Sequence, residues 1–223
     1  MTRDEVFRTV ARRVPYLLVS DVGDGDDWVS CAALVADPAS VIRHAKPDFG
    51  TDDDTVAASL FAEAYAFRVA GVALAAYALD LPVPDVSPEA VAVTVDKPRP
   101  AAVAYLTAEL RPTTADQLAV DLVGAHFAPF VAAVRDTFAV GERLLWGNVA
   151  AACAVAFLAV EPGGAERARA TEFMDACAPW FGDVGTFTDE LAGRQGWFWD
   201  RTSCCLWFRT ASGQFCDNCS LKR

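Results

Sequence analysis

The part of the chain that decides the fold is residues 52–79, DDDTVAASLFAEAYAFRVAGVALAAYAL. The aspartates load its first turn, where the helix dipole favours negative charge. The residues after them are apolar on most faces of a helix, and a helix of that kind lies in a protein core. Pro82 and Pro84 follow soon after and end it. The sequence therefore predicts one long central helix.

Shorter elements are predicted before this helix. Thr2 and Glu5 have the spacing of a capping box, so we expect a helix with one apolar face to begin there. The acidic stretch 21–27 lacks the aspartate spacing and the distal glutamate of a calcium loop, and we interpret it as a solvated turn. Residues 28–35 fit a short strand or helix, and a helix is expected over 38–44.

Two strands and then further helices are predicted after the central helix. The strands, 90–95 and 102–110, are expected to pair antiparallel across a DKPRP turn. Helices are predicted from Thr114 onward with an interruption at Pro129, over 142–159 and over 165–180, whereas 182–196 is expected to be loop-rich. The predicted fold class is therefore α+β: a helix-rich single domain with a small antiparallel sheet.

One apolar stretch bears on whether the chain crosses a membrane. Residues 144–160 carry no charge and are almost long enough to span a bilayer. They also contain Asn148 and many alanines, and we interpret them as a buried helix.

We expect an α-rich α+β body over 1–200 and a metal-binding segment over 201–223 that packs on the body and does not fold independently.

The composition excludes several classes of function. A net charge of −11 argues against a protein that must neutralise nucleic-acid phosphates. The charge is uneven, because residues 201–223 carry +3 and residues 1–200 carry −14. The charged, amphipathic start of the chain lacks the apolar region of a secretory signal.

Seven cysteines cannot all pair internally, so we expect a reducing, cytoplasmic location with Cys31, Cys153 and Cys177 as free buried thiols.

The other four cysteines lie close together in the C-terminal segment. Cys204, Cys205, Cys216 and Cys219 follow the pattern Cys-Cys-x10-Cys-x2-Cys. Thiolates so concentrated repel one another unless a disulfide or a metal centre takes them up. Four thiolates satisfy either a tetrahedral zinc ion or the two irons of a [2Fe–2S] cluster.

The spacing distinguishes these centres only in part. Cys216 and Cys219 form a zinc-type knuckle, but Cys204 and Cys205 do not, because adjacent side chains diverge and strain the backbone if both bind one ion. Two irons offer a wider target, so the pattern favours [2Fe–2S]. A zinc site and a disulfide between Cys204 and Cys205 remain open alternatives.

Other signatures of chemistry are missing from the sequence. It has no complete dinucleotide fingerprint, P-loop, HExxH or G-x-S-x-G motif. With only His44 and His126, a histidine-rich metal site is excluded, and we interpret His126 as a hydrogen-bonded structural residue. Arg201 and Arg209 flank the cysteines and are candidates for steering an anionic partner or substrate.

The cysteine segment resembles the C-terminal signature of the FhuF-like ferric siderophore reductases. The matching residues are Arg201, Ser203, Cys204, Cys205, Leu206, Phe208, Cys216, Cys219 and Leu221. The block LWGNVA at 145–150, and His126 with Pro129, also look like family features. Ser220 departs from the pattern, since a proline often follows the last cysteine. The resemblance implies that the four cysteines hold a [2Fe–2S] cluster.

The resemblance also implies a function. A [2Fe–2S] cluster donates one electron, and siderophores lose most of their affinity for iron when Fe³⁺ becomes Fe²⁺. We expect an oxidoreductase that reduces a ferric siderophore, of hydroxamate type, on a docking surface of the body. Because no nucleotide site is found, electrons are expected from a ferredoxin or a flavoprotein. A peripheral association with the inner membrane face is compatible with this expectation.

Two alternatives to a reductase are kept. The first is a zinc-stabilised binding module in which the C-terminal segment is purely structural. The second is a [2Fe–2S] redox or iron sensor that acts through a partner and has no reductase activity.

Overall fold

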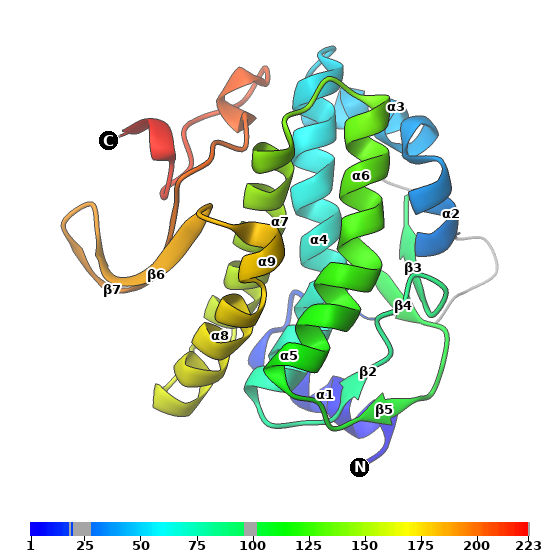
Figure 1. Ribbon diagram of the computed structural model, residues 1–223, viewed down its shortest axis with the longest axis vertical. Helices are drawn as coiled ribbons and strands as arrows, with labels where there is room; N and C mark the ends of the chain where they lie inside the picture. Colours follow the sequence, from blue (N-terminus) through cyan, green and yellow to red (C-terminus); the bar gives the residue numbers. More distant parts are fainter. Residues whose placement is uncertain (18, 20–27, 96–101, 223) are drawn as a thin grey trace.

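A computed structural model of the protein describes residues 1–17, 19, 28–95 and 102–222 (Figure 1). The turns predicted at 21–27 and in the DKPRP stretch lie outside the described residues. The described chain is helix-rich with small antiparallel sheets, which confirms the predicted α+β class.

The long central helix is confirmed as α4 (Asp54–Ala78). Asp53 caps it, because its side chain accepts hydrogen bonds from the main-chain N–H groups of Thr55 and Val56. Almost all of its faces are buried, and it packs most extensively against α7 (Glu142–Leu158), another alanine-rich helix (Figure 1). Small side chains let these two helices approach closely and form the centre of the core.

Further helices surround the α4–α7 pair. They are α1 (Arg3–Arg13), α2 (Cys31–Ala36), α3 (Pro38–Phe49), α5 (Ala115–Leu118), the π-helix η1 (Ala119–Phe127), α6 (Ala128–Thr137), α8 (Gly164–Ala176) and α9 (Ala178–Phe181). The capping box of Thr2 and Glu5 is present at the start of α1, as predicted. Helix α3 continues beyond the predicted end at residue 44, to a left-handed C-cap at Gly50.

Pro129 does not interrupt the helical run as predicted. The π-helix η1 precedes it, and the N–H of Ala128 donates to the carbonyl of Val123, five residues back. Pro129 then occupies the first turn of α6, where a proline needs no N–H partner. The wider π-helical turn thus carries the chain past the proline without a break.

The strands of the described residues form three small antiparallel sheets. Strands β1 (Trp28–Ser30), β3 (Val91–Thr94) and β4 (Val103–Tyr105) make one sheet in the order β1-β3-β4, and β2 (Val83–Pro84) pairs with β5 (Leu110–Arg111). The predicted antiparallel pair is confirmed as β3 and β4, although β4 is shorter than expected. Residues 28–35 form a strand that continues directly into a helix.

The expectation of a loop-rich region over 182–196 is wrong. Strands β6 (Gly185–Leu191) and β7 (Arg194–Arg201) form a hairpin there. Many of its residues are polar and few are buried, so the hydrophobic alternation of a strand is weak in the sequence. The hairpin is supported by stacking of Phe187 on Trp197, with ring centroids 4.0 Å apart.

Two helical stretches among the described residues are long and apolar enough to cross a membrane by length and composition alone. They are 54–78 and 115–137, with 72% and 50% of their apolar windows buried within the protein. A core helix meets the same criteria. Helix α7, which contains most of the apolar stretch 144–160, is largely buried, as predicted.

The interpretation of His126 as a structural residue is confirmed. It is fully buried in η1, and its Nδ1 and Nε2 lie 2.6 Å from the Val86 carbonyl oxygen and 2.6 Å from the Tyr65 hydroxyl. Because a carbonyl can only accept, Nδ1 carries the proton and Nε2 accepts from Tyr65. Burial lowers the pKa of His126 from 6.5 to about 4.

We therefore expect His126 to make the fold sensitive to acid. The unfolded chain binds a proton on this residue below pH 6.5 and the folded chain does not until about pH 4, so stability falls as the pH decreases through that window. The loss between pH 7 and pH 5 is about 2 kcal/mol. Urea unfolding at the two pH values measures it. His126→Gln should remove this loss, whereas the exposed-residue control His44→Gln should retain it; equal losses in both variants would contradict the assignment.

Candidate metal centre

The four candidate cysteines lie in the chain that follows β7. This chain contains the short helices η2 (Trp207–Arg209) and η3 (Ser220–Lys222). It lies beside α7, at the end of the molecule where α4 begins (Figure 1). Cys205 and Cys219 are buried, whereas Cys204 and Cys216 are partly exposed.

Local turns bring the thiols together. Leu206 has a left-handed backbone (φ 67°) and donates its N–H to Cys204 Sγ at 3.4 Å. The N–H of Cys219 donates to the carbonyl of Cys216 at 3.1 Å and closes the knuckle turn. The sulfurs of Cys205 and Cys216 are 3.7 Å apart although ten residues separate them in sequence.

This sulfur geometry fits two ligands of one metal. Thiolates about 2.3 Å from a tetrahedral metal lie about 3.8 Å from each other. Within the described residues, no group of three or more His, Cys, Asp or Glu side chains is arranged to hold one metal ion. A single zinc needs such a group, whereas each iron of a two-iron cluster needs only two cysteines. The contact of Cys205 with Cys216 is the part of such a centre that the described residues bring together.

Cys205 differs chemically from the three cysteines of the body. A hydrogen bond with Cys216 lowers the pKa of Cys205 to about 7, and the same bond raises the pKa of Cys216, so the pair shares one proton. Burial raises the pKa of Cys31 to about 12 and also raises those of Cys153 and Cys177. These three are free and buried, as predicted.

Arg201 is buried, and its expected role in steering an anionic partner or substrate stays a prediction. Only 2% of its side chain is exposed, so it does not project toward a partner in solution. Its Nε donates to the Ser203 carbonyl at 2.8 Å, Nη2 donates to Asn148 Oδ1 at 2.6 Å, and Nη1 lies 3.3 Å from Glu63 Oε1. The guanidinium therefore ties the cysteine segment to α4 and α7. These contacts have a physical reason, because a buried cation is tolerated only when partners satisfy it.

Arg209 is on the surface, where its expected role as a steering residue is neither supported nor opposed. Its Nη2 lies 2.7 Å from Asp53 Oδ2, the residue that caps α4. The adjoining main chain makes a second attachment, because the N–H of Ala211 donates to the Gly50 carbonyl at 2.9 Å. The segment is thus fastened to the start of α4.

A close approach of α7 to the segment depends on Gly147. A Cβ atom at this position would lie 2.7 Å from Ser203 Cβ and still closer to Ser203 Oγ. Rotation of the serine side chain cannot relieve the first of these contacts. Ser203 immediately precedes Cys204, so this glycine lets the start of the cysteine pair lie directly on the helix.

A cavity of about 500 Å³ opens beside the thiols. Cys205, Cys216, Arg201 and Glu63 line it together with a largely apolar wall, which includes Phe49, Leu60, Phe67, Val155 and Trp207. Burial raises the pKa of Glu63, and Arg201 opposes that rise. A ligand in this cavity would be adjacent to two of the four cysteines.

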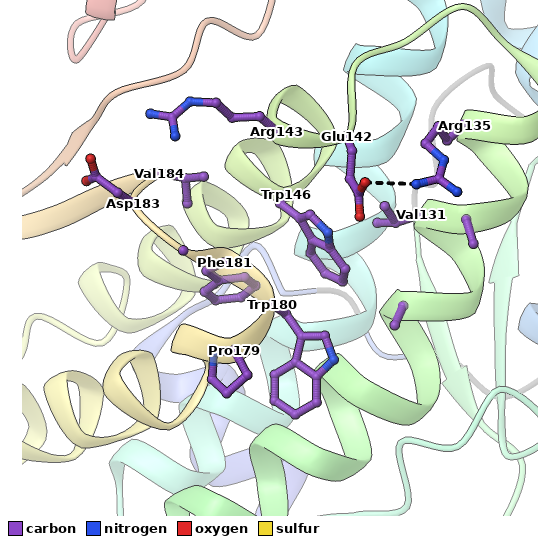
Figure 2. Close-up of a pocket in the computed structure, with 13 residues that line it drawn as sticks. Val131, Arg135, Glu142, Arg143, Trp146, Pro179, Trp180, Phe181, Asp183 and Val184 are labelled. Carbon is purple, nitrogen blue, oxygen red and sulfur yellow. Dashed lines mark hydrogen bonds and ion pairs between the residues drawn. The ribbon is translucent and has the colours of Figure 1, made fainter.

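A second cavity, of about 550 Å³, lies between α6, α7 and α9 (Figure 2). Trp146, Trp180 and Phe181 gather around it, and an ion pair of Arg135 with Glu142 borders it at 2.8 Å. No cysteine lines this cavity. It is therefore a weaker candidate for chemistry at the metal centre.

Three residues of the site were not predicted from the sequence: Ser59, Glu63 and Asn148. Ser59 and Asn148 are fully buried polar residues in apolar helices, and they bond to each other and to the cysteine segment. A single polar residue among apolar neighbours could have indicated them, because a buried polar side chain needs a hydrogen-bond partner.

Comparison with known families agrees with this geometry. Residues 59–181 match the model described as ferric iron reductase FhuF-like transporter, and residues 201–221 match the FhuF 2Fe-2S C-terminal domain. The second match contains all four cysteines and indicates a [2Fe–2S] cluster, rather than the zinc alternative. No curated protein sequence matches the chain.

The ligand assignment predicts a difference between cysteines. Cys216→Ser should abolish retention of the cluster, whereas Cys177→Ser, a change to a buried thiol of the body, should leave it. Iron and acid-labile sulfide in anaerobically purified protein measure retention. Equal loss of iron in the two variants would count against the assignment.

The contact at Gly147 predicts that an added methyl group displaces the cysteine segment. Gly147→Ala should lower the free energy of unfolding by about 1–3 kcal/mol through overpacking, and it should also reduce cluster content. Gly164→Ala in α8 is the control, since no atom lies within 4 Å of a Cβ there. The double variant Gly147→Ala/Ser203→Gly should recover part of the loss. A Gly147→Ala protein as stable as the control would refute the close contact.

Proposed function

Since the chain belongs to the FhuF-like ferric iron reductase family, we propose that it reduces ferric siderophores by one electron in the cytoplasm. The residues that hold its [2Fe–2S] cluster are, in this proposal, Cys204, Cys205, Cys216 and Cys219. The observation that carries the proposal is the cavity beside Cys205 and Cys216, which gives a chelate access to two of these cysteines.

The chemistry of the substrate accounts for a one-electron reductase. Siderophores bind Fe³⁺ through hard, anionic oxygen atoms and bind the softer Fe²⁺ much less tightly. When bound, the cluster supplies electrons singly. One transfer is therefore sufficient to release the iron, and no side chain has to form a bond to the chelate.

The cavity supports a hydroxamate substrate. Three hydroxamates balance the charge of Fe³⁺, whereas three catecholates leave the complex strongly anionic. The body carries a charge of −14, and the cavity includes the acidic residues Asp48 and Glu63. An anionic chelate would be repelled there, and a neutral chelate would not. The apolar wall suits the carbon skeleton of such a ligand.

The chain's own residues position the chelate and the cysteines. Trp207, Phe67 and Leu60 give the cavity an apolar wall against which the carbon skeleton of a chelate can pack. Arg201 places a buried positive charge beside the cysteine segment, where it stabilises negative charge. The electron donor is proposed to be a ferredoxin or a flavoprotein, because the sequence contains no nucleotide-binding motif.

The proposal predicts that the reduced protein is reoxidised by a ferric siderophore. Protein reduced anaerobically with dithionite and freed of excess reductant should recover its oxidised absorption spectrum when a ferric trihydroxamate is added. A ferrous chelator should trap one Fe²⁺ for each cluster reoxidised. A ferric triscatecholate of similar size should react more slowly. A cluster that forms but is reoxidised by none of the chelates would favour the sensor alternative.

A variant that narrows the cavity tests where the chelate docks. Val155 lines the cavity on α7 and is 39% exposed, so Val155→Trp should be tolerated and should slow reoxidation by the trihydroxamate severalfold. Reoxidation by ferricyanide should be unchanged. Val120→Trp makes the same change at an exposed valine that does not line the cavity. Equal rates in the two variants would place the docking site elsewhere.

A further inference from the structure

We propose that Ser59 and Asn148 are positioning residues that set the reduction potential of the cluster. They hold the main chain of Cys205 and the guanidinium of Arg201 in fixed places relative to the four cysteines. This inference rests on the proposed function, because it assumes that these cysteines bind the cluster.

The two residues form an unbroken chain of hydrogen bonds to a proposed ligand. Asn148 Nδ2 donates to the carbonyl oxygen of Ser59 at 2.8 Å and to Ser59 Oγ at 2.9 Å. The Ser59 oxygen accepts this second bond, so its hydroxyl hydrogen is free to donate to the carbonyl oxygen of Cys205, at 2.7 Å. Both side chains are fully buried, so no water competes for these bonds.

The other end of the Asn148 amide holds Arg201. Its Oδ1 accepts from Arg201 Nη2 at 2.6 Å, and Arg201 Nε donates to the carbonyl of Ser203, next to Cys204. A neutral amide suits this position because it has an acceptor for the cation and donors for Ser59. A carboxylate would face Ser59 with acceptors only, and an aliphatic side chain would leave the buried cation without this partner.

The two helices that carry these residues make their position rigid. Ser59 lies on α4 and Asn148 on α7, which form the most extensive helix contact in the described structure. A hydrogen bond from such a frame restricts the main chain of Cys205 more than a bond from a loop would. The regular structure of the cysteine segment over residues 202–222 is limited to two short 3₁₀ helices.

A fixed positive charge acts on the potential through simple electrostatics. Reduction adds one negative charge to the cluster, and a nearby cation attracts that charge more strongly in a buried site than across water. Asn148 holds the guanidinium through a neutral amide at Nη2, while Glu63 on α4 pairs with Nη1 at 3.3 Å. Hydrogen bonds and charges around a cluster are the means by which a protein sets its potential.

The experiment compares holoprotein of wild type with Ser59→Ala, Asn148→Asp and the control Tyr65→Phe. The control removes one buried hydroxyl from the same helix, but that hydroxyl contacts His126 and not the cysteine segment. Each protein is prepared anaerobically, and its iron and sulfide content and its free energy of unfolding are measured. The midpoint potential is obtained by spectroelectrochemical titration at one pH, and the reduced cluster is recorded by electron paramagnetic resonance.

We expect the potential to become more negative in Ser59→Ala and still more negative in Asn148→Asp, where a carboxylate offsets the charge of Arg201. The resonance g values should change in both. Tyr65→Phe should lose stability and keep the wild-type potential and g values.

Unchanged potentials and g values in Ser59→Ala and Asn148→Asp would overturn the inference and leave these residues a structural role only. If Asn148→Asp does not fold, Ser59→Ala decides the matter alone, since it removes a single oxygen atom. A wild-type protein without any cluster would instead refute the proposed function. If the wild-type protein binds the cluster and the variants keep its midpoint potential, only the present inference is refuted.

Discussion

The buried guanidinium of Arg201 is the constraint on which the rest of the site depends. A cation removed from water costs several kcal/mol unless partners replace its hydration. Here the partners are a carbonyl of the cysteine segment, the amide of Asn148 and the carboxylate of Glu63. They come from the segment, α7 and α4, so the charge can be accommodated only when all three elements are in place. The arrangement couples folding of the body to the formation of the metal centre.

The helices around this charge are built to leave little free space. The alanines of α4 and α7 let the two helices approach closely, and Gly147 extends that close packing to the cysteine segment. The few polar side chains in these helices all point to partners, as the low dielectric of a core requires. One cavity lies where the cysteine segment meets the body, and the thiols of Cys205 and Cys216 line it.

The elements that could be predicted from the sequence are those whose signal is local. The central helix follows from a long apolar run with a charged first turn, and the four cysteines follow from their spacing. The β6–β7 hairpin was missed because its polar strands carry little hydrophobic alternation. The continuity of the helix across Pro129 depends on a π-helical turn, and no pattern in the sequence predicts such a turn.

The partners of Arg201 were not predictable, because they are set by contacts between distant parts of the chain. Glu63 and Asn148 are 138 and 53 residues away from it. An arginine near cysteines at the end of a sequence indicates a surface charge as readily as a buried one. Only the packing of α4 against α7 shows that this residue lies inside the protein.

The location of the cysteines after β7 also has a consequence for biosynthesis. During translation the helices that supply Ser59, Glu63 and Asn148 leave the ribosome before any of the four ligands does. The receiving surface can therefore be assembled first, since domains fold as the chain emerges. A cluster held by the four cysteines would then form on a scaffold that already exists, and an interrupted synthesis would yield a body without these four thiols.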